Sequence, residues 1–178
     1  MKDALESPYI FNGTIVAESP ERALSILFFP MLLSAFVCSI AAGFLSDYYG
    51  GQRKRILFAS GGLMSLACLL FALTRSFTFD MLLSALFGIG FGAFSAIDWA
   101  LATDILPEAE NFAKDMGLWS LAMVVPNVLA APIAGNLLDY FEKVGWGDFH
   151  FGYSVIFLLG VCYFGVGSYM FRFIKNVK

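Results

Sequence analysis

Long uncharged apolar stretches alternate along this chain with short polar intervals. A helix needs about 20 mostly apolar residues to cross the hydrocarbon core of a bilayer. Five stretches have this length, at residues 22–45, 56–74, 79–103, 116–138 and 151–173. The charged residues collect in the intervals between them, so lipid is the solvent that suits the stretches. The pattern predicts an all-α fold: a polytopic membrane helix bundle with about five transmembrane helices.

The intervals are too short to form a separate soluble domain. Residues 1–21 form a polar N-terminal segment, residues 22–173 the transmembrane bundle, and residues 174–178 a basic tail. Ser19-Pro20-Glu21 suits the start of the first helix, because serine caps, proline fits the first helical position, and an acid suits the first turn.

Composition removes several classes of protein from consideration. The chain is 59% hydrophobic and 14% charged, whereas soluble domains are about 45–50% apolar and about 25% charged. A net charge of −3 gives no electrostatic footprint for nucleic acid. Cys38, Cys68 and Cys162 lie inside apolar runs and have neither metal-ligand spacing nor a disulfide framework. We expect no metal, no cofactor and no enzymatic reaction, since no nucleophile is paired with a base.

The distribution of cations predicts an orientation. Lysine and arginine accumulate on the cytoplasmic side of membrane proteins. With five spans, one side collects seven cations: Arg53, Lys54, Arg55, Lys114, Arg172, Lys175 and Lys178. The other side collects four: Lys2, Arg22, Arg75 and Lys143. We therefore expect the N-terminus outside and the C-terminus in the cytoplasm.

Two helix ends repeat one another. Residues 42–49 read AGFLSDYY and residues 134–141 read AGNLLDYF, with five of eight positions identical. The repeated ends lie on opposite sides of the membrane, as inverted-topology repeats of three helices require. The last three helices then form a complete triplet. The first two are the end of a preceding triplet that lacks its first helix.

The first polar interval has an ordered frame of glycine, aspartate and cations. On this frame the chain resembles the major facilitator superfamily of secondary transporters, whose cytoplasmic loops carry a pattern like G-x-L-[SA]-D-R-x-G-R-[RK]. The matching positions are Gly43, Leu45, Ser46, Asp47, Gly50 and the triplet Arg53, Lys54 and Arg55. Tyr48 departs from the pattern, and the cations are displaced by a residue or two. Residues 98–107 and 113–117 look like helix ten and its loop in sugar-transporter-like members.

The resemblance implies helices eight to twelve of a twelve-helix fold, the C-terminal half. It also implies a gating role on the cytoplasmic side for Gly43, Asp47, Gly50, Arg53, Lys54 and Arg55. The alternative is an ordinary cytoplasmic loop that only follows the preference of cations for that side. That alternative explains the cations but not the ordered glycines and aspartate before them.

Asp98 is the main candidate for function. A charge inside a span costs at least about 2.5–3.5 kcal/mol, so such a residue faces a cavity or a partner. Ser95, Asp98 and Trp99 fall on one broad helix face, which suits hydroxyl groups, a stacked ring and a coupling proton. The alternative is a packing contact with a polar group on a neighbouring helix. Residues at strict four-residue spacing, Ser84, Gly88, Gly92 and Ala96, predict a ridge for close helix packing.

Prolines interrupt the fourth stretch. Pro126 and Pro132 free backbone carbonyls that must be satisfied inside the protein, and transporters place such breaks at cavities or hinges. Asn127 shares a stripe with small residues, so we expect it to face the central cavity. A plain kink with a hydrogen bond between helices is the alternative.

The predicted function is secondary active transport of a small polar solute, such as a sugar, by alternating access. Asp98, Trp99, Ser95 and Asn127 would line the solute pathway. Five helices are less than one half of the implied fold. Besides the lipid bilayer, transport therefore requires a protein partner, either a missing N-terminal half or a second copy of this chain. The competing interpretation is a membrane scaffold or regulatory protein that does not transport, or a truncated remnant of a transporter.

Overall fold

Five long helices and one short hairpin make up the structure. The computed structural model describes residues 9–11, 14–17, 20–48, 53–74, 76–105, 112–144 and 150–170. In chain order the elements are β1 (Tyr9–Phe11), β2 (Thr14–Ala17), α1 (Pro20–Tyr48), α2 (Arg53–Leu73), α3 (Phe77–Ile105), α4 (Phe112–Val144) and α5 (His150–Met170). All five helices are long and apolar enough to cross a membrane. The predicted all-α bundle of five membrane-length helices is therefore confirmed.

Most helices run past the apolar stretches seen in the sequence. The largest difference is α4, which runs from Phe112 to Val144 where the apolar stretch covers residues 116–138. Polar residues at its ends continue the helix: the first turn holds Asp115 and the last turn Lys143. The tail at residues 174–178 lies outside the described residues.

A β-hairpin precedes the bundle, which hydropathy did not indicate. Strands β1 and β2 pair antiparallel, with Phe11 opposite Thr14. Aromatic and β-branched residues flank Asn12-Gly13 in the sequence, and this dipeptide between such residues is a strong local signal for a hairpin. Treating residues 1–21 as only a polar segment missed that signal.

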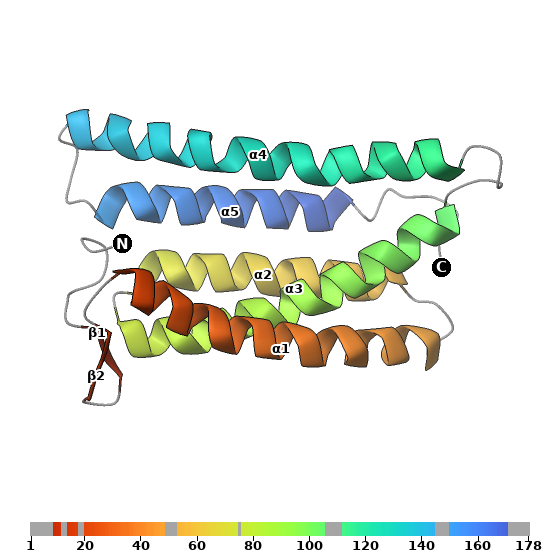
Figure 1. The fold of residues 1–178 in the computed structure, drawn as a ribbon, viewed down its shortest axis with the longest axis horizontal. Coiled ribbons are helices and arrows are strands. Elements are labelled where there is room, and N and C mark those ends of the chain that lie inside the picture. Colours follow the sequence, from red (N-terminus) through yellow and green to blue (C-terminus); the bar gives the residue numbers. More distant parts are fainter. Residues whose placement is uncertain are drawn as a thin grey trace.

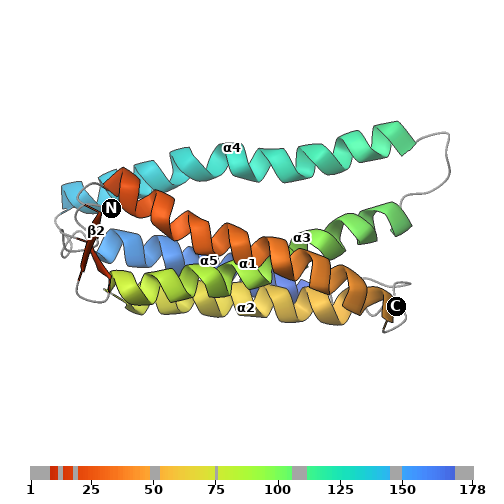
Figure 2. The ribbon, with the colours of Figure 1, turned by 60° about the horizontal axis from the view of Figure 1, so that its bottom comes forward.

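The helices lie side by side along one long axis (Figure 1). We call the end that carries β1 and β2 the hairpin end, and the end that carries Arg53, Lys54, Arg55 and Lys114 the basic end. Helix α3 packs against both α1 and α2, and α2 also packs against α5. Helix α4 packs chiefly against α5 and runs apart from the α1–α3 group in Figure 2.

Helices α1 and α3 approach so closely that glycine is required between them. A Cβ atom added at Gly88 would overlap the carbonyl oxygen of Met31, and one at Gly92 would overlap that of Ala35. Ser34 lies in the same contact, with its Oγ 3.0 Å from the Met31 carbonyl oxygen and 2.9 Å from that of Ala85 on α3. The small-residue ridge predicted from the sequence is therefore confirmed at its two glycines.

The opposite face of α3 packs on α2. A Cβ at Gly90 would press on Met64 and on the Ser60 carbonyl. Nearer the basic end, a buried cluster joins three helices through Ala42 of α1, Leu57 of α2, and Ile97 and Leu101 of α3. Helix α3 is thus the shared wall between α1 and α2.

Serine hydroxyls join α2 and α5 at three levels. Ser168 donates to the Phe58 carbonyl at 2.8 Å, Ser65 to that of Val161 at 3.1 Å, and Ser154 to that of Ala72 at 3.2 Å. The contacts are seven residues apart on each helix, which is the heptad spacing of left-handed helix pairs. Phe71 and Phe157 stack beside them, with ring centroids 5.3 Å apart.

We predict that the glycines of the α1–α3 contact cannot be enlarged. Gly92→Leu should lower the free energy of unfolding by about 3 kcal/mol or more, because the side chain would meet the backbone of α1 rather than a movable side chain. The measurement is thermal or denaturant unfolding in detergent micelles. Gly43→Ala is the control, since nothing lies within 4 Å of a Cβ there. A loss of stability in Gly43→Ala as large as in Gly92→Leu would contradict the prediction.

The serine contacts between α2 and α5 allow a second prediction. Ser65→Ala combined with Ser168→Ala should lower the free energy of unfolding by about 1 kcal/mol, near 0.6 kcal/mol for each hydrogen bond between membrane helices. Ser39→Ala is the matched control, because Ser39 bonds only within its own helix, to the Phe36 carbonyl. An equal loss in Ser39→Ala and in the double variant would show that the α2–α5 bonds contribute nothing specific.

Candidate functional site

Asp98 lies on α3 in the basic-end half of the bundle. It is seven residues before the last residue of α3, so about 10 Å of helix separates it from that end. Its side chain is 6% exposed. Next to it in sequence, Ile97 belongs to the buried cluster that joins α1, α2 and α3. The carboxyl group therefore lies beside the buried cluster that joins the three helices.

The three predicted pathway residues of α3 differ in environment. Asp98 is buried, Ser95 is half-buried, and Trp99 is 49% exposed. A step of 100° per residue separates adjacent positions on a helix, so Trp99 points away from the face that buries Asp98. The structure places Trp99 at the border of the site rather than beside the carboxyl group.

Asn127 lies on a stretch of α4 that is exposed from residue 120 to residue 133. Its side-chain amide donates to the Met123 carbonyl of the same helix at 2.9 Å. Both Pro126 and Pro132 lie within α4, which remains one helix through them. The structure does not bring Asn127 against Asp98.

At the basic end, one predicted gating residue joins two helices. The Arg53 guanidinium donates to the Ala100 carbonyl on α3 at 2.7 Å, and so links the first turn of α2 to the helix that carries Asp98. Asp47 and Arg55 are exposed, Lys54 and Gly43 are half-buried, and Gly50 lies outside the described residues.

Two further buried polar groups occur in this half of the bundle. Trp119 Nε1 on α4 and Ser46 Oγ on α1 are buried, and neither has a hydrogen-bond partner among the described residues. The sequence analysis did not single out Trp119, and it named Ser46 only as a position of the loop pattern, without expecting it to be buried. The available signal was a tryptophan several residues inside a membrane helix, where its N–H needs an acceptor. Buried polar groups without partners are places where water or a solute can bind.

We predict that Arg53 holds the basic ends of α2 and α3 together. Arg53→Met should speed amide hydrogen exchange around Ala100 about fivefold, because removing a hydrogen bond of about 1 kcal/mol lets the end of α3 open more often. The neighbouring Arg55→Met, at an exposed position, is the control and should leave exchange on α3 unchanged. Equal exchange in both variants would remove Arg53 from this role.

Comparison with known proteins identifies the family. A family model described as the Major Facilitator Superfamily matches residues 9–177. The chain is 33% identical over 164 residues to the chloramphenicol resistance protein CraA of Acinetobacter baumannii, an alignment that covers 86% of this chain and 37% of that protein. It is 30% identical over 109 residues to uncharacterized MFS-type transporters from two strains of Mycobacterium tuberculosis, covering 61% of this chain and 15% of each relative.

The chain therefore spans well under half of the length of these curated relatives. No solved structure matched it. The match of one family model along nearly the whole chain agrees with the five membrane-length helices and with the glycine–aspartate frame at the end of α1. This chain belongs to the Major Facilitator Superfamily.

Proposed function

We propose that this chain is the C-terminal part, helices eight to twelve, of a secondary transporter that moves a small polar solute by alternating access. The observation that carries the proposal is Asp98, a carboxyl group 6% exposed inside a membrane-length helix. Its burial is costly in lipid, and such residues mark solute or proton pathways. The process is movement of a solute across the membrane, without bond making or breaking.

Asp98 lies where binding of a proton or a solute would affect the arrangement of the helices. Helix α3 contacts both α1 and α2, and the residues on either side of Asp98 in the next turns are packed tightly against them. Binding of a proton at Asp98 would change the charge inside that contact, and binding of a solute hydroxyl would change its hydrogen bonding. Because the three helices share one buried cluster, the change would act on all of them together.

Chemistry at the site favours a solute with hydroxyl groups and a flat face. Asp98 accepts hydrogen bonds, Ser95 donates and accepts, and Trp99 offers an indole ring. A sugar or sugar derivative has these features. Chloramphenicol, named in the relative from Acinetobacter baumannii, also joins hydroxyl groups to an aromatic ring. Similarity to that protein makes chloramphenicol the second solute to test.

Helix α4 supplies the other side of the proposed pathway. The prolines at 126 and 132 lie within it, each removing one N–H from the helix ladder. Asn127 and Asn136 each donate to a carbonyl four residues earlier, at 2.9 Å. The prolines remove the ladder donors to the Ala122 and Val128 carbonyls, whereas the two amides bond to the Met123 and Pro132 carbonyls. The ladder of α4 is therefore weakened at two positions, where the helix is able to bend. Asn127 would meet the solute after the missing helices close around α4.

The proposed transporter also needs helices beyond these five. On α4 the exposed apolar side chains include Leu121, Val125, Val128, Leu129 and Ile133. They form an apolar face along the middle of α4, against which an N-terminal half or a second copy would pack. The basic end would face the cytoplasm, where Asp47 and the triplet Arg53–Arg55 would gate the pathway.

The test is solute uptake in membrane vesicles prepared from cells that carry the gene in its natural setting. Radiolabelled chloramphenicol and a neutral sugar are supplied separately. Asp98→Asn should reduce uptake of the transported solute at least tenfold, since the amide can neither ionise nor accept a proton. The exposed Asp139→Asn, a carboxyl on α4, is the matched control and should stay within twofold of the parent.

Three outcomes separate the alternatives. Uptake of one solute that depends on Asp98 supports transport and names its class. Uptake that is unchanged in Asp98→Asn removes this residue from the mechanism. No uptake of either solute above that of vesicles from cells that lack the gene would favour the scaffold or regulatory interpretation.

A further inference from the structure

Two faces of α3 pack against neighbouring helices, and a third face carries two buried acids. Gly88 and Gly92 adjoin α1, and Gly90 adjoins α2. Asp80 in the first turn of α3 and Asp98 near its other end are 5% and 6% exposed. Eighteen steps of about 100° make five full turns, so these two acids lie on the same face. That face is turned away from the glycine contacts with α1 and α2.

The third face of α3 looks into the protein rather than toward lipid. An acid in a membrane helix faces the interior of the bundle or an aqueous cavity, because a charge in hydrocarbon is costly. Acids at both ends of α3 therefore place this face on the inside along most of the helix. In the transport proposed above, a solute that moves along α3 passes the groups that lie between the two acids.

Two phenylalanines lie between these acids on the same face. Phe91 is seven residues before Asp98, and Phe87 is seven residues after Asp80. A step of seven residues returns to within about 20° of the same direction. The rings of Phe87 and Phe91 are stacked, with centroids 6.4 Å apart and 13° between their planes. Phe164 of α5 meets Phe87 edge to face, at 5.7 Å and 71°.

These contacts hold the rings in place and leave one of them accessible. Stacked and edge-to-face pairs are the favourable arrangements of aromatic rings. Phe87 and Phe164 are half-buried, whereas Phe91 is 43% exposed. Because this face looks inward, the exposed part of Phe91 is available to a solute. Ser95, one turn from Phe91 toward Asp98, is half-buried and offers a hydroxyl group between the ring and the acid.

We propose that Phe87 and Phe91 bind an aromatic ring of the solute while Asp98 binds its polar group. Seven residues of helix span about 10 Å. The solute class is therefore an amphipathic molecule whose ring lies about 10 Å from a hydroxyl group or another hydrogen-bond donor. A sugar without an aromatic substituent would occupy only the Asp98 end. This assignment rests on the proposed transport function, and it gives ring recognition to Phe91 rather than to Trp99.

Photolabelling tests the ring contact without measuring transport. The probe is azidophenylethyl glucoside, which joins a flat ring to hydroxyl groups through a short spacer. It is applied to membrane vesicles from cells that carry the gene in its natural setting. Specific labelling is the part that excess phenylethyl glucoside suppresses, and mass spectrometry should locate it in α3 around Phe87 and Phe91. Cyclohexylethyl glucoside has the same polar group and spacer but no flat ring, so about fivefold more of it should be needed for the same suppression.

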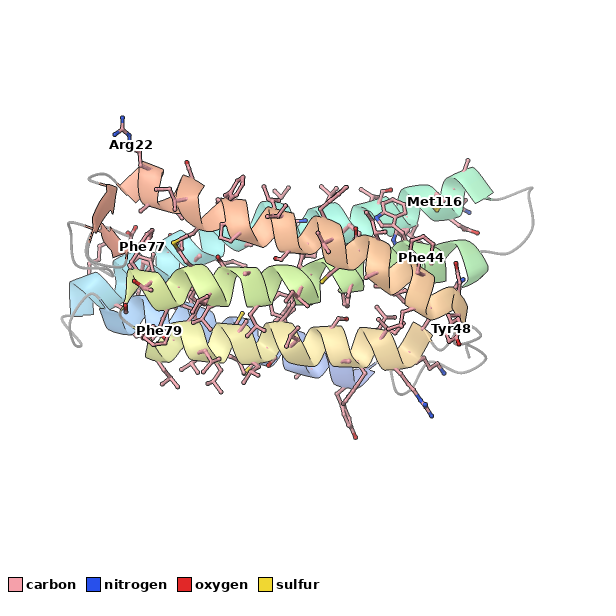
Figure 3. All side chains as sticks on the ribbon, turned by 90° about the horizontal axis from the view of Figure 1, so that it is seen from below. Arg22, Phe44, Tyr48, Phe77, Phe79 and Met116 are labelled. Carbon is pink, nitrogen blue, oxygen red and sulfur yellow. The ribbon has the colours of Figure 1, made fainter. Side chains whose placement is uncertain are left out.

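Matched variants separate the ring contact from general effects on the protein. In Phe91→Leu, half suppression should need about fivefold more phenylethyl glucoside, because the aromatic contact is lost. Phe91→Tyr keeps the ring and should stay within about twofold of the parent. The control is Phe79→Leu, at a side chain that is 60% exposed at the hairpin end of the same helix (Figure 3). Phe79 lies about 100° around α3 from the face of Asp98, so this variant should match the parent.

Each outcome bears on the ring contact separately from transport. Equal suppression by the cyclohexyl compound, an equal loss in Phe79→Leu, or no specific labelling of α3 would overturn the proposal. In the uptake test, uptake that depends on Asp98 but is unchanged in Phe91→Leu would leave the transport function standing and would also overturn the ring contact. Specific labelling that depends on Phe91, in vesicles that take up neither solute, would support the ring contact and count against transport.

Discussion

Close contact between backbones is the constraint on which the rest of this structure depends. Lipid surrounds membrane helices with hydrocarbon as apolar as their own side chains, so helices gain little from burying leucine against leucine. They gain from approaching closely. In α3, Gly88 and Gly92 admit the backbone of α1, and Gly90 admits α2. The same helix carries Asp80 and Asp98, so both buried carboxyl groups are held by this contact.

The two carboxyl groups sit at opposite ends of one rigid element. Asp98 lies near the buried cluster around Leu57 and Ile97, and Asp80 near the cluster around Ala23 and Phe77. Each position therefore joins a titratable group to a helix contact.

Hydropathy predicted the five helices because lipid demands a long apolar run, and that demand is visible in composition alone. The glycine ridge was also readable, since small residues at four-residue spacing have few other uses in a span. Burial of individual residues was not readable. Asp98 and Trp99 are adjacent, yet one is 6% and the other 49% exposed, and this difference depends on which neighbours pack there. The buried polar atoms of Trp119, Ser46 and Asp80 were not predicted for the same reason, because an atom without a partner among the described residues is a property of three-dimensional packing.

The serine contacts between α2 and α5 have a mechanical meaning. Their seven-residue spacing fixes the register of the two helices, because a slide to the next matching position would require about 10 Å of travel. Smaller slides would break all three bonds together. We therefore expect α2 and α5 to move together as one rigid unit. Helix α4 is joined to this pair mainly through its contacts with α5. A relative motion of α4 would therefore disturb fewer helix contacts than a relative motion of α2 and α5.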